Sequence, residues 1–248
     1  MKAFNIVLSF SIVVASASAV SAAVVWSDDF ESYANQAGFD ADWPVTGGTA
    51  PTWSTDQSTS PTHSILEPSG SPGRVSSVTT YPLNDVNGSD TSRLVVEYDL
   101  YINPADLTSS RRYIELREED GGAGNILALG LTNLGSLDNT KFGFRNLFTW
   151  TQLSAPRRAG WNHVKATLDS TDITFKINSY PKEVFARAST GGYGRIYMGS
   201  GFSNNTVDPF DGFTLIDDLS VQNVPEPASL ALIGAGALAL IGAIRRRR

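Results

Sequence analysis

Apolar and polar residues alternate along short segments of this chain, and the clearest example spans residues 94–102. Its even positions are apolar, while Glu97, Asp99 and Tyr101 stand between them. Because the side chains of a strand point alternately to its two faces, this pattern predicts a strand with one buried face.

Similar segments recur along the chain and are separated by Gly, Asn and Asp residues that favour turns. The segments predicted as strands are 24–31, 74–80, 94–102, 113–117, 126–131, 141–147, 149–153, 161–168, 172–177, 184–188, 194–201 and 213–221. No segment between the two chain ends has a helical period. About a dozen short strands predict an all-β fold, an antiparallel sandwich or jelly roll.

One long segment, residues 32–72, lacks this alternation and is rich in Ser, Thr, Gly and Pro. We expect it to be irregular, with Trp43 and Trp53 as isolated large residues. A loop of this length in a compact domain is often a binding loop or a lid. The alternative is that the two tryptophans pin the loop onto the sandwich.

The N-terminus has the pattern of an export signal. Lys2 is followed by an apolar run from residue 3 to about residue 19, and Val20-Ser21-Ala22 provides small residues for cleavage. Residues 1–23 are therefore predicted to be a secretory signal peptide. Cleavage is expected after Ala22 or Ala23, with Ala19 as the alternative.

The C-terminus has three parts in a fixed order: Pro225-Glu226-Pro227, an uncharged apolar run at 228–244, and four arginines at 245–248. As a helix, the run would be roughly 26 Å long, close to the bilayer core of about 30 Å. The arginines favour a cytoplasmic location, so this single transmembrane helix would leave the rest of the chain on the other side.

The last 25 residues, 224–248, resemble a PEP-CTERM sorting signal, and the alternative is an ordinary membrane anchor. In that family the Pro-Glu-Pro motif is read by the membrane enzyme exosortase. The resemblance implies an exported protein of a bacterium that makes exopolysaccharide. The chain would be held in the membrane by its C-terminus before processing, and afterwards located at the cell surface or in the extracellular matrix.

Composition limits what the exported segment, residues 24–222, can do. The chain has no cysteine, which excludes disulfides, thiolate metal sites and a cysteine nucleophile. Without Lys2, Glu226 and the terminal arginines, 14 basic and 24 acidic residues remain, a net charge of −10. An acidic domain of this kind is a poor binder of nucleic acid.

The exported segment resembles concanavalin A-like lectin/glucanase domains, which include laminin-G-like modules. The resemblance is carried by 160–169 with 174–178, and by the terminal strands at 26–30 and 215–221. It implies a jelly-roll sandwich of two antiparallel sheets. The superfamily contains lectins, glycoside hydrolases and polysaccharide lyases, so the fold does not determine the function.

The catalytic motif of the glucanase branch, Glu-x-Asp-x-x-Glu, is not matched. In the nearest segment Arg117 replaces the middle carboxylate, between Glu115 and Glu119. Alternating charges of this kind are typical of a solvated strand face, and no catalytic residue is predicted. A lyase would need a Tyr or His base, and His63 and His163 are the only histidines.

Sugar binding needs aromatic faces together with planar polar groups. Tyr193, Arg195 and Tyr197 alternate on one predicted strand face, opposite Ile196 and Met198. A jelly roll could bring these residues onto one concave sheet with further candidates. The full set is Tyr101, Arg117, Trp150, Trp161, Tyr193, Arg195 and Tyr197. The alternative is ordinary cross-strand packing.

Asp217 falls on the apolar face of the last predicted strand unless a bulge intervenes. A buried carboxylate needs a partner. The superfamily resemblance implies a structural Ca²⁺ between the first and last strands. Its ligands would be Asp217, backbone carbonyls near Phe30 and Glu31, and a contribution from Asp29 or Glu31. The alternative is a hydrogen bond from backbone or an arginine.

Together these features predict an exported, non-catalytic protein that binds or organises extracellular polysaccharide. One alternative is a polysaccharide hydrolase or lyase with an unfamiliar site. The other is a purely structural matrix protein without a ligand.

Overall fold

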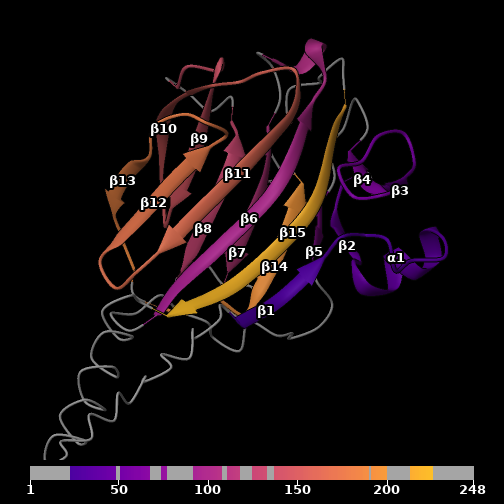
Figure 1. Cartoon of the computed structure of the whole chain (residues 1–248), viewed down its shortest axis with the longest axis horizontal. Coiled ribbons are helices and arrows are strands. Elements are labelled where there is room, and N and C mark those ends of the chain that lie inside the picture. Colours follow the sequence, from indigo (N-terminus) through magenta and orange to yellow (C-terminus); the bar gives the residue numbers. More distant parts are fainter. Residues whose placement is uncertain are drawn as a thin grey trace, which may run out of the picture.

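The alternating segment at 94–102 forms β6 (Ser92–Ile102), a central strand of a two-sheet sandwich (Figure 1). The computed structural model describes residues 23–48, 51–67, 74–76, 92–107, 111–117, 125–132, 137–189, 191–199 and 213–225. Every strand pair in these ranges is antiparallel, which confirms the predicted all-β architecture.

Sheet A has the strand order β13-β12-β11-β6-β15-β4-β3, and β1 also pairs with β15. Besides β6, its strands are β1 (Ala23–Asp28), β3 (Thr52–Ser54), β4 (Ser64–Glu67), β11 (Gly160–Leu168), β12 (Asp172–Ile177), β13 (Glu183–Ala186) and β15 (Thr214–Pro225). The first and last strands of the domain are therefore neighbours in one sheet.

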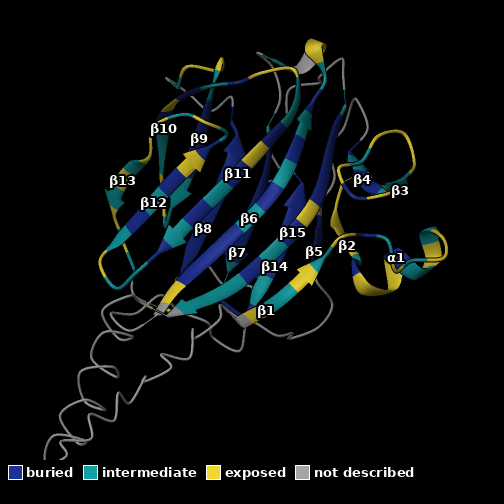
Figure 2. Ribbon diagram, in the orientation of Figure 1, coloured by how far each residue is buried: buried dark blue, intermediate teal, exposed yellow. Residues whose placement is uncertain are grey.

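Sheet B has the order β10-β9-β8-β7-β14-β5-β2. Its strands are β2 (Val45–Gly47), β5 (Arg74–Ser76), β7 (Arg112–Arg117), β8 (Ile126–Leu131), β9 (Lys141–Asn146), β10 (Thr149–Pro156) and β14 (Arg195–Gly199). The hydrophobic core lies between the two sheets, and Figure 2 shows the buried residues along their strands.

The segment at 32–72 is more regular than the sequence predicts. It contains α1 (Gln36–Asp42) as well as β2, β3 and β4. The Asn35 side chain accepts a hydrogen bond from the backbone N–H of Gly38, which caps this helix. Seven residues make only two turns, so α1 is too short to give a recognisable helical period.

Both tryptophans of this segment hold it against the first strand. Trp43 is buried, and its Nε1 donates to Oδ2 of Asp28 at 2.9 Å. Nε1 of Trp53 donates to the backbone carbonyl of Phe30 at 2.9 Å. The pinning role, one of the two alternatives for these residues, is therefore observed.

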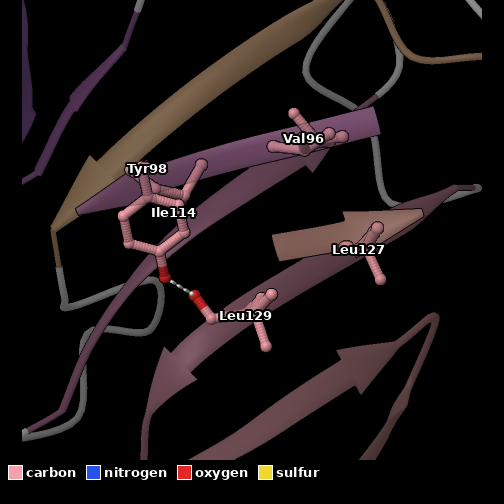
Figure 3. A pocket seen from close by; sticks show the side chains of 7 residues that line it. Val96, Tyr98, Ile114, Leu127 and Leu129 are labelled. Carbon is pink, nitrogen blue, oxygen red and sulfur yellow. Dashed lines mark hydrogen bonds between the residues drawn. The ribbon is translucent and has the colours of Figure 1, made fainter. Parts of the chain in front are cut away.

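A cavity of about 10 Å³ lies inside the core, between β6, β7, β8 and β11. Figure 3 shows Val96, Ile114 and Leu127 in its wall, with the Tyr98 hydroxyl donating to the carbonyl of Leu129. This hydrogen bond satisfies a polar group that would otherwise be buried without a partner.

One ion pair connects the two sheets inside the sandwich. Nε of Arg112 on β7 lies 2.5 Å from Oε2 of Glu67 on β4, and both side chains are fully buried. Burial raises the pKa of Glu67 to about 7, although the Arg112 guanidinium lowers it. Burial therefore disfavours the ionised carboxylate more than the guanidinium stabilises it.

Candidate functional site

Strand β7 presents polar residues to the outer face of sheet B. Ile114 and Leu116 belong to the core between the sheets. The alternate residues Tyr113, Glu115 and Arg117 therefore point outward. These three residues mark the outer face of sheet B, to which the neighbouring strands also contribute residues.

The neighbouring strands continue this set as a row of residues across sheet B. Glu115 lies opposite Tyr197 of β14 on one side and Ala128 of β8 on the other. Ala128 lies opposite Arg145 of β9, which lies opposite Trp150 of β10. Five strands at a spacing of about 4.8 Å make the row roughly 19 Å long.

Trp150 and Tyr113 meet at one end of the row, although two strands separate them. Their ring centroids are 5.2 Å apart in an edge-to-face arrangement. Gly130 and Gly143 lie between β7 and β10 in the register of Tyr113, and their lack of side chains leaves room for the rings. A Cβ at Gly130 would lie 2.2 Å from the carbonyl oxygen of Arg112. This position therefore requires glycine.

The guanidinium of Arg111 lies over this aromatic pair. Its Cζ is 5.7 Å from the ring centroid of Tyr113 and 5.9 Å from that of Trp150. Burial raises the pKa of Tyr113, the charges of Arg111 and Arg145 lower it, and the Glu115 carboxylate raises it. The Tyr113 phenol therefore lies close enough to two arginines and one acid for their charges to affect its pKa.

A second aromatic and cationic contact lies on the other side of Glu115. The Cζ of Arg117 is 5.2 Å from the ring centroid of Tyr197, and its Nε forms an ion pair with Oε1 of Glu115. Arg195 lies directly opposite Arg117 in the ladder. Glu115 is fully buried. The expectation of a solvated strand face is therefore wrong at Glu115, because this residue lies in the middle of the row.

The structure brings four of the seven predicted sugar-binding residues to this outer face: Arg117, Trp150, Arg195 and Tyr197. It adds Arg111, Tyr113 and Arg145, which sequence reasoning missed. The alternation of the strand at 113–117 could have identified Tyr113. The positions of Arg111 and Arg145 depend on which strands pair.

The other three predicted residues lie elsewhere, so the expectation that one sheet gathers all seven is wrong. Tyr101 and Trp161 are cross-strand partners on sheet A, with ring centroids 5.5 Å apart. Tyr193 is buried in the core. It precedes β14, so the alternation of that strand does not extend to it.

Sheet A carries a different outer face. Phe213 stacks on Tyr101 at a centroid distance of 5.9 Å. Next to the aromatic pair, Nδ1 of His163 lies 2.9 Å from Oδ1 of Asp99. This hydrogen bond raises the pKa of His163. The His163 side chain is half exposed and forms a surface pair with Asp99.

Asp217 does not point into the core between the sheets. A bulge shifts the register between Asp217 and Ser220, and Asp218 has a φ of 49°. The bulge places Ile216 and Leu219 in the core and turns Asp217 to the outer side, where it is nonetheless fully buried. The prediction that Asp217 lies on the apolar face is therefore wrong, because the bulge that the sequence left open is present.

The segment at 59–63 covers the Asp217 carboxylate and supplies its hydrogen bonds. Oδ2 accepts from the backbone N–H groups of Thr59 at 2.6 Å and Ser60 at 2.9 Å. Oδ1 accepts from the backbone N–H of Asp218 at 2.8 Å. The hydrogen bonds from backbone, which were the alternative to a cation at Asp217, are present.

The oxygen atoms around Ser60 are also suitable ligands for a hard cation. Within 3.2 Å of the Ser60 hydroxyl lie the carbonyls of Asp29 and His63, Oε1 of Glu31 and both carboxylate oxygens of Asp217. One hydroxyl proton cannot satisfy five acceptors. Converging oxygens of this kind are the ligands that Ca²⁺ takes.

Two of these groups are carboxylates, and no cluster of three or more His, Asp or Glu side chains in the described ranges could hold a metal ion. Burial alone would raise the pKa of Glu31. Hydrogen bonds from Thr62 and His63 instead hold it well below its usual range. Asp29 contributes its carbonyl, while its Oδ1 accepts from the backbone N–H of Glu31.

The chain ends lie mostly outside the described residues. Of the sorting motif, only Pro225 is included; it closes β15 and lies opposite Ser92, whereas Glu226 and Pro227 lie beyond the described ranges. The predicted signal peptide up to residue 22 and the predicted helix at 228–244 also lie beyond them. Within the described ranges, no helix is long and apolar enough to cross a membrane.

Residues 223–248 match the PEP-CTERM protein-sorting motif. The sorting signal predicted at the C-terminus is therefore present, and it indicates an exported protein sorted to the cell surface. A comparison with curated protein sequences finds no match.

Solved structures with the same architecture include an endo-1,3-beta-glucanase from Streptomyces sioyaensis. It is 16% identical, with a TM-score of 0.52, and the match covers 83% of this chain and 97% of that one. A protein with a galectin-like fold from Bacillus subtilis is 15% identical, with a TM-score of 0.49 and coverages of 82% and 98%. The cellulose induced protein Cip1 is 14% identical, with a TM-score of 0.49 and coverages of 79% and 96%. At 16% identity, the similarity to the glucanase shows the fold alone, a jelly roll of two antiparallel sheets.

Proposed function

We propose that this exported protein binds extracellular polysaccharide on the outer face of sheet B and does not cleave it. The observation that carries the proposal is the row from Trp150 to Tyr197, in which the partly exposed ring of Trp150 and partly exposed guanidinium groups lie beside the buried rings of Tyr113 and Tyr197. Rings of this kind stack on the apolar faces of sugars, and planar polar groups fix the orientation of the ligand.

The ion pair of Glu115 supports a non-catalytic role. A general acid in glycoside hydrolysis needs a raised pKa and a second carboxylate about 5–10 Å away. Glu115 instead forms an ion pair with the guanidinium of Arg117. Among the described outward residues of β7, β8, β9, β10 and β14, it is the only acid. Glu119, which the sequence alternation places on the same strand face as Glu115, lies outside the described ranges.

The oxygen set at Ser60 supports a second proposal, a structural Ca²⁺ between the first and last strands of the domain. Asp217, Glu31, Ser60 and the carbonyls of Asp29 and His63 would hold the ion. A bound Ca²⁺ would supply a positive charge that links β1, the 59–63 segment and β15. This role is structural and separate from the outer face of sheet B.

Trp150→Ala tests the binding proposal on a glycan array with the exported protein. An aromatic anchor contributes more than about 1 kcal/mol to binding, so we expect the affinity to fall about fivefold or more. Trp161→Ala is the matched control, since it removes the same side chain from the outer face of sheet A. Circular dichroism verifies that both variants fold.

Two results would contradict the proposal. The first is that the wild-type protein binds no glycan on the array. The second is that Trp150→Ala binds as well as the wild type. Release of new reducing ends or unsaturated sugars from a bound polysaccharide would contradict the non-catalytic part.

A further inference from the structure

The outer face of sheet B is positively charged, although the exported domain as a whole carries a net charge of −10. Arg111, Arg117, Arg145 and Arg195 surround the aromatic row, and Glu115 is the only acid at the described outward positions of its five strands. The composition of the chain therefore does not explain the charge of this face.

Only one of these arginines has a carboxylate partner in the described part of the chain. Arg117 pairs with Glu115. The remaining ion pairs of the described residues involve none of Arg111, Arg145 and Arg195. Among the described outward residues of these five strands, the named arginines therefore outnumber the acids by three.

The arrangement of these charges is unfavourable in the absence of an anion. Arg117 and Arg195 lie directly opposite each other in the ladder between β7 and β14, and like charges in that position destabilise a sheet. Arg111 and Arg145 both lie close enough to Tyr113 to lower the pKa of its phenol. A binding role for anionic groups accounts for this concentration of positive charge.

The aromatic contacts place the guanidinium groups beside the rings. Arg111 lies over Tyr113 and Trp150, and Arg117 lies over Tyr197. A sugar ring stacked on Trp150, the partly exposed ring of this set, would have its ring substituents next to Arg111. Guanidinium groups bind carboxylates through two parallel hydrogen bonds, which a hydroxyl cannot accept in the same way.

We propose that the ligand of this face is an acidic polysaccharide whose sugar units carry carboxylate groups, that is, a polyuronate. The proposal rests on the proposed function, because it names the class of ligand for the same site. Neutral glucans would use the ring of Trp150 but offer no negative charge to Arg111, Arg145 and Arg195.

The test compares each polyuronate with a neutral form of the same backbone. Titration calorimetry of the exported protein uses polygalacturonate, alginate and glucuronan, each next to its carboxyl-reduced derivative. We expect at least one polyuronate to bind tenfold or more tightly than its reduced form, and its affinity to fall as NaCl increases. Arg145→Gln and Arg195→Gln should each weaken polyuronate binding several-fold, and more strongly than they weaken binding of the reduced form.

Arg158→Gln is the control, because Arg158 contacts Tyr180 away from this face, with its Cζ 4.8 Å from the ring centroid. It should change neither affinity. Thermal unfolding verifies the fold of all three variants.

The outcomes separate this inference from the proposed function. Reduced polymers that bind as tightly as polyuronates, with binding lost in Trp150→Ala, would overturn the inference and leave polysaccharide binding intact. Dextran sulfate that binds more tightly than every polyuronate would overturn the choice of carboxylate. Absence of binding to every polymer in this set and on the glycan array would overturn both proposals.

Discussion

The buried pair between Glu67 and Arg112 allows a quantitative test of how the two sheets are held together. Replacing Arg112 by Met keeps an apolar stem of similar length in the core but removes the guanidinium that lies 2.5 Å from the Glu67 carboxylate. The pKa of Glu67 is already raised to about 7 by burial, and Arg112 is the group that keeps it from rising further. The substitution should therefore raise this pKa above 7.

The sign and size of the effect follow from proton linkage. In the wild type the folded state holds the Glu67 proton between pH 4.5 and about 7, while the unfolded chain releases it. The stability therefore falls through this window, by about 3 kcal/mol for this residue, and is constant above it. In Arg112→Met the fall continues above pH 7, at about 1.4 kcal/mol per pH unit until the new pKa is reached.

Urea unfolding at pH 5.5, 7, 8 and 9 measures the difference between variant and wild type. Below pH 7 this difference reports the pH-independent effect of removing the buried guanidinium and its hydrogen bonds, and between pH 7 and 9 it should grow by about 2–3 kcal/mol. Between pH 7 and 9, the difference between the double variant Arg112→Met/Glu67→Gln and the wild type should stay constant. Arg158→Met, an exposed control, should differ in stability from the wild type by the same amount at every pH.

A difference between Arg112→Met and wild type that stays constant from pH 5.5 to 9 would refute this reasoning. It would mean that burial and the Arg112 guanidinium do not shift the pKa of Glu67 in opposite directions. A pH dependence that persists in the double variant would assign the effect to another group.

Four further predictions concern other parts of the molecule. Ca²⁺ should raise the melting temperature in calorimetry and a chelator should reverse this; Asp217→Asn should abolish the response, and the surface variant Asp138→Asn should keep it. Tyr98→Phe leaves the Leu129 carbonyl without its hydroxyl donor and should cost about 1 kcal/mol in urea unfolding. Gly130→Ala places a Cβ 2.2 Å from a backbone oxygen and should cost at least about 1–3 kcal/mol in the same assay. Replacing Pro225, Glu226 and Pro227 by alanines should leave a longer, unprocessed form in the membrane fraction, visible by immunoblot, whereas unchanged processing would contradict the role of the motif.

The strands were the most predictable part of the fold. Alternation located the segments 126–131 and 172–177 with the bounds that β8 and β12 have in the structure. It failed where elements were too short for a period, as in α1 and the three-residue strands β2 and β3. It also placed Asp217 on the wrong side, because a bulge adds one residue and reverses the faces beyond it.

The candidate site was only partly predictable. The alternation correctly separated Tyr197 from Met198 and Arg117 from Leu116, since each pair lies on one strand. It could not separate Trp150 from Trp161, which begin as equivalent candidates but lie on different sheets. It also gave no indication that Arg145 lies between Trp150 and Glu115.

Local patterns in the sequence thus determined which residues form strands, which face of a strand is buried, and that the chain ends in a sorting signal. The tertiary structure decided which outward-facing residues share a sheet, and so which aromatic rings and arginines form one row. The reason is physical: a side-chain period of two arises within a single strand, whereas sheet membership arises from hydrogen bonds between strands far apart in the sequence.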